Sequence, residues 1–136
     1  MIAWWQIILL TAYAGFQIMD ELHWYSSAGS AVFSGFITGL IMGDMTTGLL
    51  IGGQMQLTIL GVGTFGGASR IDANSGTLIA TAFAVSSNMD PELALSLLGV
   101  PVAAILVYTD IAGRFANTFF GHMCDADVEK MNWNAY

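Results

Sequence analysis

The sequence predicts an all-α integral membrane protein with about four to five membrane segments. Of its 136 residues, 55% are hydrophobic and only 10% are charged, whereas roughly 25% of the residues in typical soluble domains are charged. The charged residues are clustered, so the runs between them approach the roughly 20 residues that a helix needs to cross a bilayer. Residues 1–110 also lack the charged helix face that a soluble helical protein would need.

The composition excludes several classes of function. Ten acidic residues stand against three basic ones, for a net charge of -7, so no basic surface is available for nucleic acid. Cys124 cannot form an internal disulfide, and no Cys/His cluster has metal-ligand spacing. His23 and His122 have no partners that would suit a phosphoryl acceptor, and no catalytic motif is recognisable. We therefore expect no catalytic site, cofactor or metal in this chain itself.

The first predicted membrane helix covers residues 1–19. This run carries no charge and lacks the basic start of a cleavable signal peptide, so we expect it to be retained. Trp4 and Trp5 are expected at one membrane interface, where aromatic residues are enriched. Asp20 and Glu21 then mark a break or turn.

A second helix is predicted over residues 28–43 and is expected to end at Gly43 and Asp44. Small residues recur in this run at about four-residue spacing, which places them on one helix face and lets another backbone approach closely. These residues are Gly29, Ser34, Gly35, Gly39 and Gly43.

Two further apolar runs cover residues 73–89 and 93–109. Asp90 and Pro91 lie between them and form a helix-start signal, in which the aspartate caps the helix and the proline occupies its first turn. Pro101 lies inside the second of these runs and is expected to kink it.

The pattern changes after Asp110, so we divide the chain into membrane helices over residues 1–110 and an amphipathic end with a polar tail over 111–136. Aromatic and aliphatic residues alternate there with polar ones at helical intervals, which is typical of an interfacial helix. Arg114 and Lys130 favour a cytoplasmic location for this end. The alternating residues are Ile111, Phe115, Phe119 and Phe120 with Arg114, Asn117 and His122.

The glycine-rich segment 45–72 is predicted to be a broken helix, either a pair of short helices or a re-entrant hairpin. Each glycine in a helix interior costs up to about 1 kcal/mol relative to alanine, and irregular backbone survives at membrane depth only where protein or water surrounds it. We expect the bend near residues 61–67. The glycines are Gly48, Gly52, Gly53, Gly61, Gly63, Gly66 and Gly67.

Polar side chains in and after this segment are the candidate substrate-binding residues: Gln54, Gln56, Asp72 and Asn74. Broken helices form transporter binding sites because they present directed polar groups at membrane depth. The two glutamine amides suit sugar hydroxyls, and an unwound stretch would align them where a helix would not. A carboxylate at membrane depth is costly unless it is paired or functional.

Structural explanations exist for the same residues. Gln54 and Gln56 could hold helices together by hydrogen bonds. Arg70 could pair with Asp72 as a clamp in an interfacial loop. Asp20 and Asp44 are better explained as loop or cap residues.

The motifs MGDMTTGLLIGGQMQLTILGVG and FGGASRIDANSGTLIATAFAV resemble the IIC membrane subunit of the mannose/fructose/sorbose family of the bacterial sugar phosphotransferase system. The resemblance covers nearly the whole chain. It includes the early Asp20-Glu21 pair, a GD-x-x-TG element, a GG-x-x-[QE] element ending at Gln56, and a glycine-alanine run that ends in aspartate. Gln56 falls where many members have glutamate. Asp72 falls on an aspartate usually preceded by proline, which is Ile71 here.

The resemblance implies a multi-pass sugar permease of the bacterial inner (cytoplasmic) membrane that carries a hexose or amino sugar. Such a subunit works in an oligomer with a IID membrane partner. A cytoplasmic IIB subunit, charged from IIA, phosphorylates the sugar. Family members are about twice as long as this chain, so we expect it to be an amino-terminal half of a IIC subunit. The alternatives are a scaffold half that docks to IID without contacting sugar, and a small channel.

Overall fold

The structure is a computed structural model that describes residues 2–20, 23, 26, 28–62 and 69–129. Its regular elements are all helical within these residues, which confirms the predicted all-α class. The elements are α1 (Trp4–Met19), α2 (Ala31–Met42), α3 (Met45–Ile59), α4 (Ala73–Ser87), α5 (Pro91–Ala94), the π-helical turn η2 (Leu95–Gly99) and α6 (Val100–Glu129).

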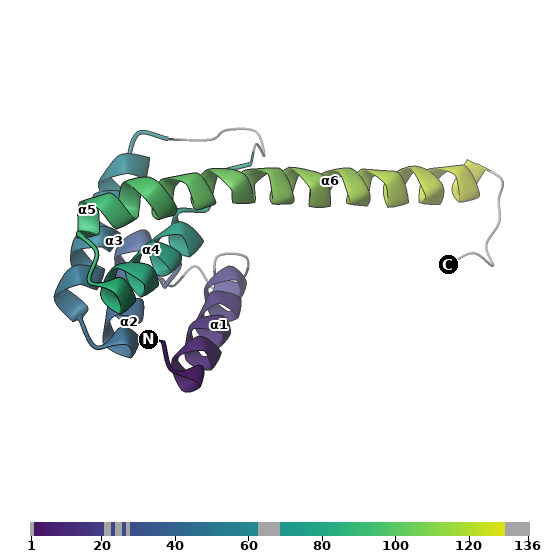
Figure 1. Ribbon diagram of the computed structural model, residues 1–136. Coiled ribbons are helices and arrows are strands. Elements are labelled where there is room, and N and C mark those ends of the chain that lie inside the picture. The colour runs from purple at the N-terminus through teal and green to yellow at the C-terminus, as the bar shows by residue number, and fades with distance from the viewer. Residues whose placement is uncertain (1, 21–22, 24–25, 27, 63–68, 130–136) are drawn as a thin grey trace.

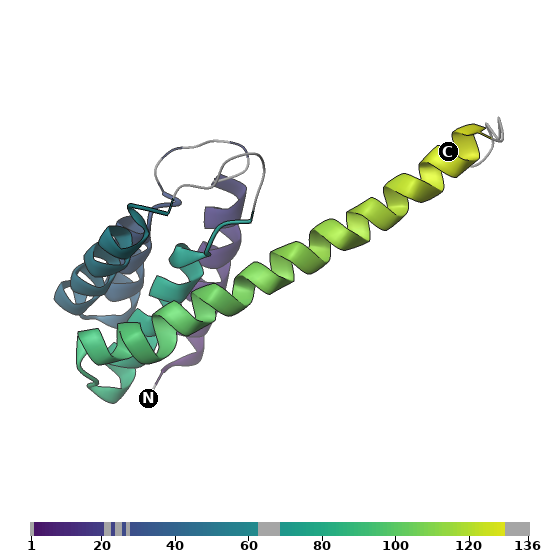
Figure 2. The same cartoon turned by 90° about the horizontal axis from the view of Figure 1, so that it is seen from above.

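The helices form a bundle from which one long helix projects (Figure 1). α2 packs most extensively against α3 and then against α4, and α4 also contacts η2 and α6. α1 lies at the side of this bundle, and α6 starts within it and extends far beyond it (Figures 1 and 2). Small side chains dominate the buried core, which consists of Ala31, Ile51, Met55, Ala73, Ala80, Ala84, Ala94, Leu95 and Ala103.

α1 matches the first predicted helix. The Gln6 side chain accepts a hydrogen bond from the Ala3 N–H at 2.8 Å, which satisfies one of the free donors at the helix start. The same amide donates to the Ile41 carbonyl at 3.1 Å and so links α1 to the end of α2. Asp20 is the C-cap residue of α1.

α2 and α3 contact each other backbone to backbone through glycines. A Cβ added to Gly48 would lie 2.8 Å from the Gly39 Cα and closer still to the Gly35 carbonyl oxygen. A Cβ on Gly52 would lie 2.7 Å from the Ala31 carbonyl oxygen. These distances are shorter than real Cβ contacts, so only glycine permits this approach. The predicted role of the small residues of α2 in close packing is thereby supported.

Gly48, Gly52 and Gly53 do not break the helix in which they lie, although glycine disfavours a helix interior. All three lie inside α3, which is an uninterrupted α-helix from Met45–Ile59. Gly48 and Gly52 are four residues apart and face α2, so the energy of close packing offsets their poor helix propensity. Of the bend expected at residues 61–67, only positions 61 and 62 fall within the described residues.

A tight connection joins α2 to α3, as the sequence predicted. Gly43 adopts a left-handed conformation with φ of 90° and ends α2, which glycine does without steric cost. Asp44 caps α3, because its carboxylate accepts from the Thr47 N–H at 3.1 Å and from the Thr47 hydroxyl at 2.6 Å. The Thr47 hydroxyl and N–H hold the pKa of Asp44 below its usual value.

α4 is the most buried helix and lies against both α2 and the start of the long helix. A Cβ on Gly76 would lie 2.5 Å from the Gly99 carbonyl oxygen, so these two backbones are also in direct contact. The Thr77 hydroxyl donates to the Ala73 carbonyl at 2.7 Å, one turn earlier, which satisfies this polar group inside the core. α4 ends at Asn88, which adopts a left-handed conformation with φ of 48°.

The predicted helix-start signal at Asp90 and Pro91 is confirmed. The Asp90 carboxylate accepts from the Glu92 N–H at 2.9 Å, and Pro91 is in the first turn of α5. The helix then widens into η2, where the Val100 N–H donates to the Leu95 carbonyl. We expected a kink at Pro101. The distortion beside this proline is the π-helical turn, and the helix continues through Pro101 as α6.

α6 runs without interruption past Asp110, where the sequence pattern changes. The Asp110 carboxylate pairs with Arg114 one turn later, with 2.9 Å between Nε and Oδ2, and this spacing supports a helix. From Tyr108 to Ala126 its described side chains are exposed. Among the described residues, Pro91–Ala126 is the helical stretch long and apolar enough to cross a membrane, and Ala31–Met42 is a shorter apolar helix. The predicted four to five spans therefore stay a prediction.

The glycine contact gives a direct prediction for Gly48→Ala. The added methyl group meets the backbone of α2, which cannot rotate away as a side chain could, so the helices must separate. Overpacking of this kind costs typically about 1–3 kcal/mol. We expect lower membrane abundance and a lower midpoint of thermal unfolding in detergent.

Gly53→Ala is the matched control in the same helix. A Cβ at Gly53 would meet nothing within 4 Å, and alanine favours a helix over glycine by up to about 1 kcal/mol. The control variant should therefore be as stable as the unmodified protein or more stable. Equal destabilisation by both substitutions would show that the α2–α3 contact does not depend on the absence of a side chain.

Candidate functional site: a polar cavity between the helices

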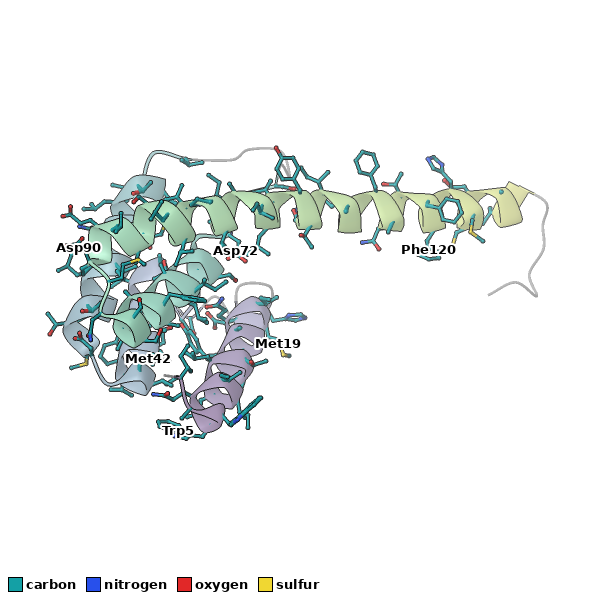
Figure 3. All side chains as sticks on the ribbon, viewed as in Figure 1. Trp5, Met19, Met42, Asp72, Asp90 and Phe120 are labelled. Carbon is teal, nitrogen blue, oxygen red and sulfur yellow. The ribbon has the colours of Figure 1, made fainter. Side chains whose placement is uncertain are left out.

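A cavity of about 810 Å³ lies where the ends of several helices meet. Its walls come from the end of α1, the start of α2, the end of α3, the start of α4 and the middle of α6. Figure 3 labels Asp72 at the start of α4 and Met19 at the end of α1, on the same side of the bundle. Ligand sites typically have volumes of about 300–1,000 Å³ and a few polar groups in a largely apolar wall. Three of the four predicted binding residues line this cavity: Gln56, Asp72 and Asn74.

Gln56 reaches from α3 to the start of α2. Its Oε1 accepts a hydrogen bond from the Ala31 N–H at 3.1 Å. This N–H belongs to the first turn of α2 and has no partner within the helix, so the glutamine satisfies it. The bond also fixes which end of the amide is oxygen. The Nε2 group has no hydrogen-bond partner among the described residues and can donate to a ligand in the cavity.

Asn74 is held through its amide nitrogen, whereas Gln56 is held through its amide oxygen. Its Nδ2 donates to the Gly29 carbonyl, and its backbone carbonyl accepts from the buried Ser34 hydroxyl at 2.9 Å. The Oδ1 atom has no hydrogen-bond partner in the part of the chain that is described, so this residue of the cavity lining keeps a free acceptor. Gln56 and Asn74 thus offer one donor and one acceptor, and both are anchored on residues 29–31.

Asp72 is the N-cap of α4, with its Oδ1 accepting from the Ser75 N–H at 3.0 Å. Its backbone is fixed by a hydrogen bond from the Ala73 N–H to the Ile71 carbonyl at 2.9 Å. With φ of -78° and ψ of 77° this is an inverse γ-turn. The turn defines the position of Asp72 although Ile71 stands in place of a proline. The cap uses only one of the two carboxylate oxygens of Asp72, which belongs to the cavity lining.

Gln54 lies elsewhere. In a regular helix, residues two apart point about 200° away from each other, so the expected alignment of Gln54 with Gln56 is wrong. Gln54 faces α5, with its Nε2 3.5 Å from the Glu92 Oε1. It lines a shallower hollow of about 450 Å³, together with Leu57 and Ser96 among others.

The cavity also contains charged groups that the sequence indicates only as cap, clamp, boundary or helix-face residues. Arg70 belongs to the wall that leads into α4, and Asp110 and Arg114 belong to α6. Asp20 lies at the end of α1 and is 1% exposed. The hydroxyl of Ser26 donates to its carboxylate at 2.6 Å and holds the pKa of Asp20 below its usual value. No local pattern could have placed these residues around one cavity, since they lie up to 94 positions apart.

The chemistry of this wall is that of recognition by hydrogen bonds. Amide donors and acceptors, carboxylates and guanidinium groups match the hydroxyl groups of a small polar ligand. No group of three His, Cys, Asp or Glu side chains suited to a metal ion occurs in the described residues. His122 and Cys124 are on the exposed part of α6, away from the cavity.

Comparisons with known proteins give relatives of one kind. The chain is 32% identical to the sorbose-specific EIIC component of the phosphotransferase system of Lacticaseibacillus casei, over 73% of this chain and 35% of that protein. It is 36% identical to the putative N-acetylgalactosamine permease IIC component 2 of Escherichia coli, over 53% of each chain. It is 25% identical to the mannose-specific EIIC component of Escherichia coli, over 95% of this chain and 47% of that protein.

The chain spans about half the length or less of these relatives. No solved structure matches it. The family of sorbose-specific IIC components of the phosphotransferase system matches residues 4–136. This match covers nearly the whole chain, and so the protein belongs to the sorbose-specific IIC family of the sugar phosphotransferase system.

Proposed function

We propose that this chain is a sugar-translocating part of a IIC subunit in a phosphoenolpyruvate-dependent phosphotransferase system. It accepts a hexose or an amino sugar at the cytoplasmic membrane of a bacterium, where it is a multi-pass protein. A IID subunit completes the membrane complex, and the cytoplasmic IIA and IIB subunits supply the phosphoryl group. The family match and the names of the relatives support this proposal, because they describe permease or EIIC components for sorbose, mannose and N-acetylgalactosamine.

The observation that carries the proposal is the anchored amide pair in the cavity. Gln56 presents a donor and Asn74 presents an acceptor, and each uses its other polar atom to bind the backbone at the start of α2. A sugar hydroxyl both donates and accepts, so this pair suits neighbouring hydroxyl groups or the amide of an N-acetylated sugar. Because the amides are already fixed, sugar binding would not have to order them.

Asp72 adds an acceptor with a full negative charge to the same wall. Its Oδ1 is occupied by the cap of α4, so the other oxygen is the one that would accept from a sugar hydroxyl. Hydrogen bonds to a charged acceptor contribute about 1.5–3 kcal/mol, more than those between neutral groups. Among the predicted binding residues, this carboxylate thus offers the strongest single contact to a neutral sugar.

Gln56→Ala tests the binding site, with Gln54→Ala as its matched comparison in the same helix. Loss of a neutral hydrogen bond costs about 0.5–1.5 kcal/mol, so Gln56→Ala should raise the KM of uptake about 2- to 12-fold. The measurement is the initial rate of uptake of radiolabelled mannose, sorbose and N-acetylgalactosamine by cells that contain the complete complex. Membrane abundance, measured by immunoblot, separates binding from assembly.

The Gln54→Ala variant locates the site. A rise in KM only for Gln56→Ala supports binding in the cavity. A rise only for Gln54→Ala moves the site to the hollow beside α5. Normal kinetics for both variants, and for Asp72→Asn and Asn74→Ala, would support the scaffold alternative, in which this chain assembles with IID and contacts no sugar.

Gln56→Glu separates the two atoms of this side chain. Glutamate retains an oxygen that can accept from the Ala31 N–H, so α2 and α3 should stay joined. The Nε2 donor becomes a negatively charged acceptor, which reverses the hydrogen bond offered to the sugar. We expect normal membrane abundance together with a changed order of preference among the three sugars. An unchanged order would show that the Nε2 group does not contact them.

A further inference from the structure

A buried carboxylate lies behind the amide pair, at the end of α1. Asp20 is 1% exposed and belongs to the cavity wall. A charged group in such a position is costly unless hydrogen bonds replace the lost water. The partners of this carboxylate therefore show what it does for the fold around the cavity.

The Asp20 carboxylate accepts hydrogen bonds from the connection between α1 and α2. Its Oδ1 accepts from the Ser26 N–H at 3.2 Å and from the Ser26 hydroxyl at 2.6 Å. The pKa of Asp20 lies below its usual value because of the Ser26 hydroxyl first, and the nearby backbone N–H groups of Ser26, Gly29 and Ala28 lower it further. Asp20 thus binds the backbone that leads directly into α2.

The same backbone provides the hydrogen-bond partners of both side-chain amides. The Gly29 carbonyl accepts from Asn74, and the Ala31 N–H donates to Gln56 at 3.1 Å. The Ala28 carbonyl accepts in addition from the Tyr13 hydroxyl of α1 at 3.1 Å. Residues 28–31 are therefore bound both by side chains of α1 and by Gln56 and Asn74, the candidate sugar-binding residues.

We propose that Asp20 is a positioning residue for sugar binding: its carboxylate fixes the backbone of residues 28–31, and this backbone sets the distance and orientation of Gln56 and Asn74. This inference rests on the proposed function. Asp20 itself need not contact the sugar. Its negative charge matters because both the N–H and the hydroxyl of Ser26 donate to it, and a charged acceptor binds such donors more strongly than a neutral one.

Asp20→Asn is the test, in cells that contain the complete complex. Asparagine keeps one acceptor oxygen, but it loses the charge and places an N–H donor among donors. We expect KM to rise about 5- to 10-fold, because hydrogen bonds to a charged acceptor become weaker bonds to a neutral one, while the maximal rate per molecule in the membrane changes less than about twofold. The probe is whichever of the three radiolabelled sugars the unmodified complex takes up.

Asp44→Asn is the matched control. Asp44 accepts from the N–H and the hydroxyl of Thr47 at 3.1 and 2.6 Å, the same pattern that Asp20 makes with Ser26, but Asp44 is not part of the cavity wall. A structural role alone would affect both variants in the same way, through abundance and thermal stability. A rise in KM for Asp20→Asn but not for Asp44→Asn supports positioning. An unchanged KM for Asp20→Asn overturns it.

A combined variant shows whether Asp20 acts through the amides. In a background with both Gln56→Ala and Asn74→Ala, Asp20→Asn should raise KM no further, because residues that act through one another are not additive. A further increase of the full 5- to 10-fold would overturn the proposal. If the Asp20→Asn protein does not accumulate in the membrane, Ser26→Ala replaces it as the test. A rise in KM smaller than about 5- to 10-fold then supports positioning, and an unchanged KM overturns it.

The two proposals fail in different ways. Normal KM values in the Gln56 and Asn74 variants would remove the sugar site itself. Raised KM values in those variants, with a normal KM in Asp20→Asn, would leave the sugar site in place and remove only the positioning role.

Discussion

The backbone contact between α2 and α3 is the constraint on which the rest of the structure depends. Gly52 packs against Ala31 and Val32, and no side chain separates the two helices at this level. Gln56 is one turn further along α3, so this close approach brings its amide within reach of the Ala31 N–H. With a larger residue at position 52 the helices would lie further apart, and the amide could no longer span the gap. The glycines therefore determine the site as well as the packing.

Much of the fold could be predicted from the sequence because the signals are local. The cap at Asp90 with Pro91, the end of α2 at Gly43 and the first helix all follow from short-range rules, and the structure confirms them. The glycines of α3 show where helix propensity alone is insufficient. Gly48 and Gly52 lie inside a regular helix, because their four-residue spacing serves the same close packing that the small residues of α2 indicate.

The candidate site was predictable only in part. Gln56, Asp72 and Asn74 were chosen for their polar chemistry in an apolar chain, and the structure does bring them to one cavity. Gln54 was chosen on the same grounds, but helical geometry turns it away. The role of Asp20 depends on its hydrogen bonds with Ser26, and the presence of Arg114 depends on where α6 crosses the bundle. Such contacts follow from tertiary structure and leave no pattern in neighbouring residues.

The two sides of the cavity are held by different forces. On the amide side, glycine contacts and hydrogen bonds that avoid unsatisfied buried groups fix α2, α3 and α4 together, and shifting one helix would break several of these interactions at once. On the opposite side, α6 is packed near its start, where Gly76 meets Gly99 and Ala103. Asp110 and Arg114 lie about two turns or more beyond that contact. The Asp110 carboxylate interacts there with the Ser69 side chain ahead of α4. The amide side is therefore fixed by backbone contacts, whereas the α6 side depends at this level on polar side chains.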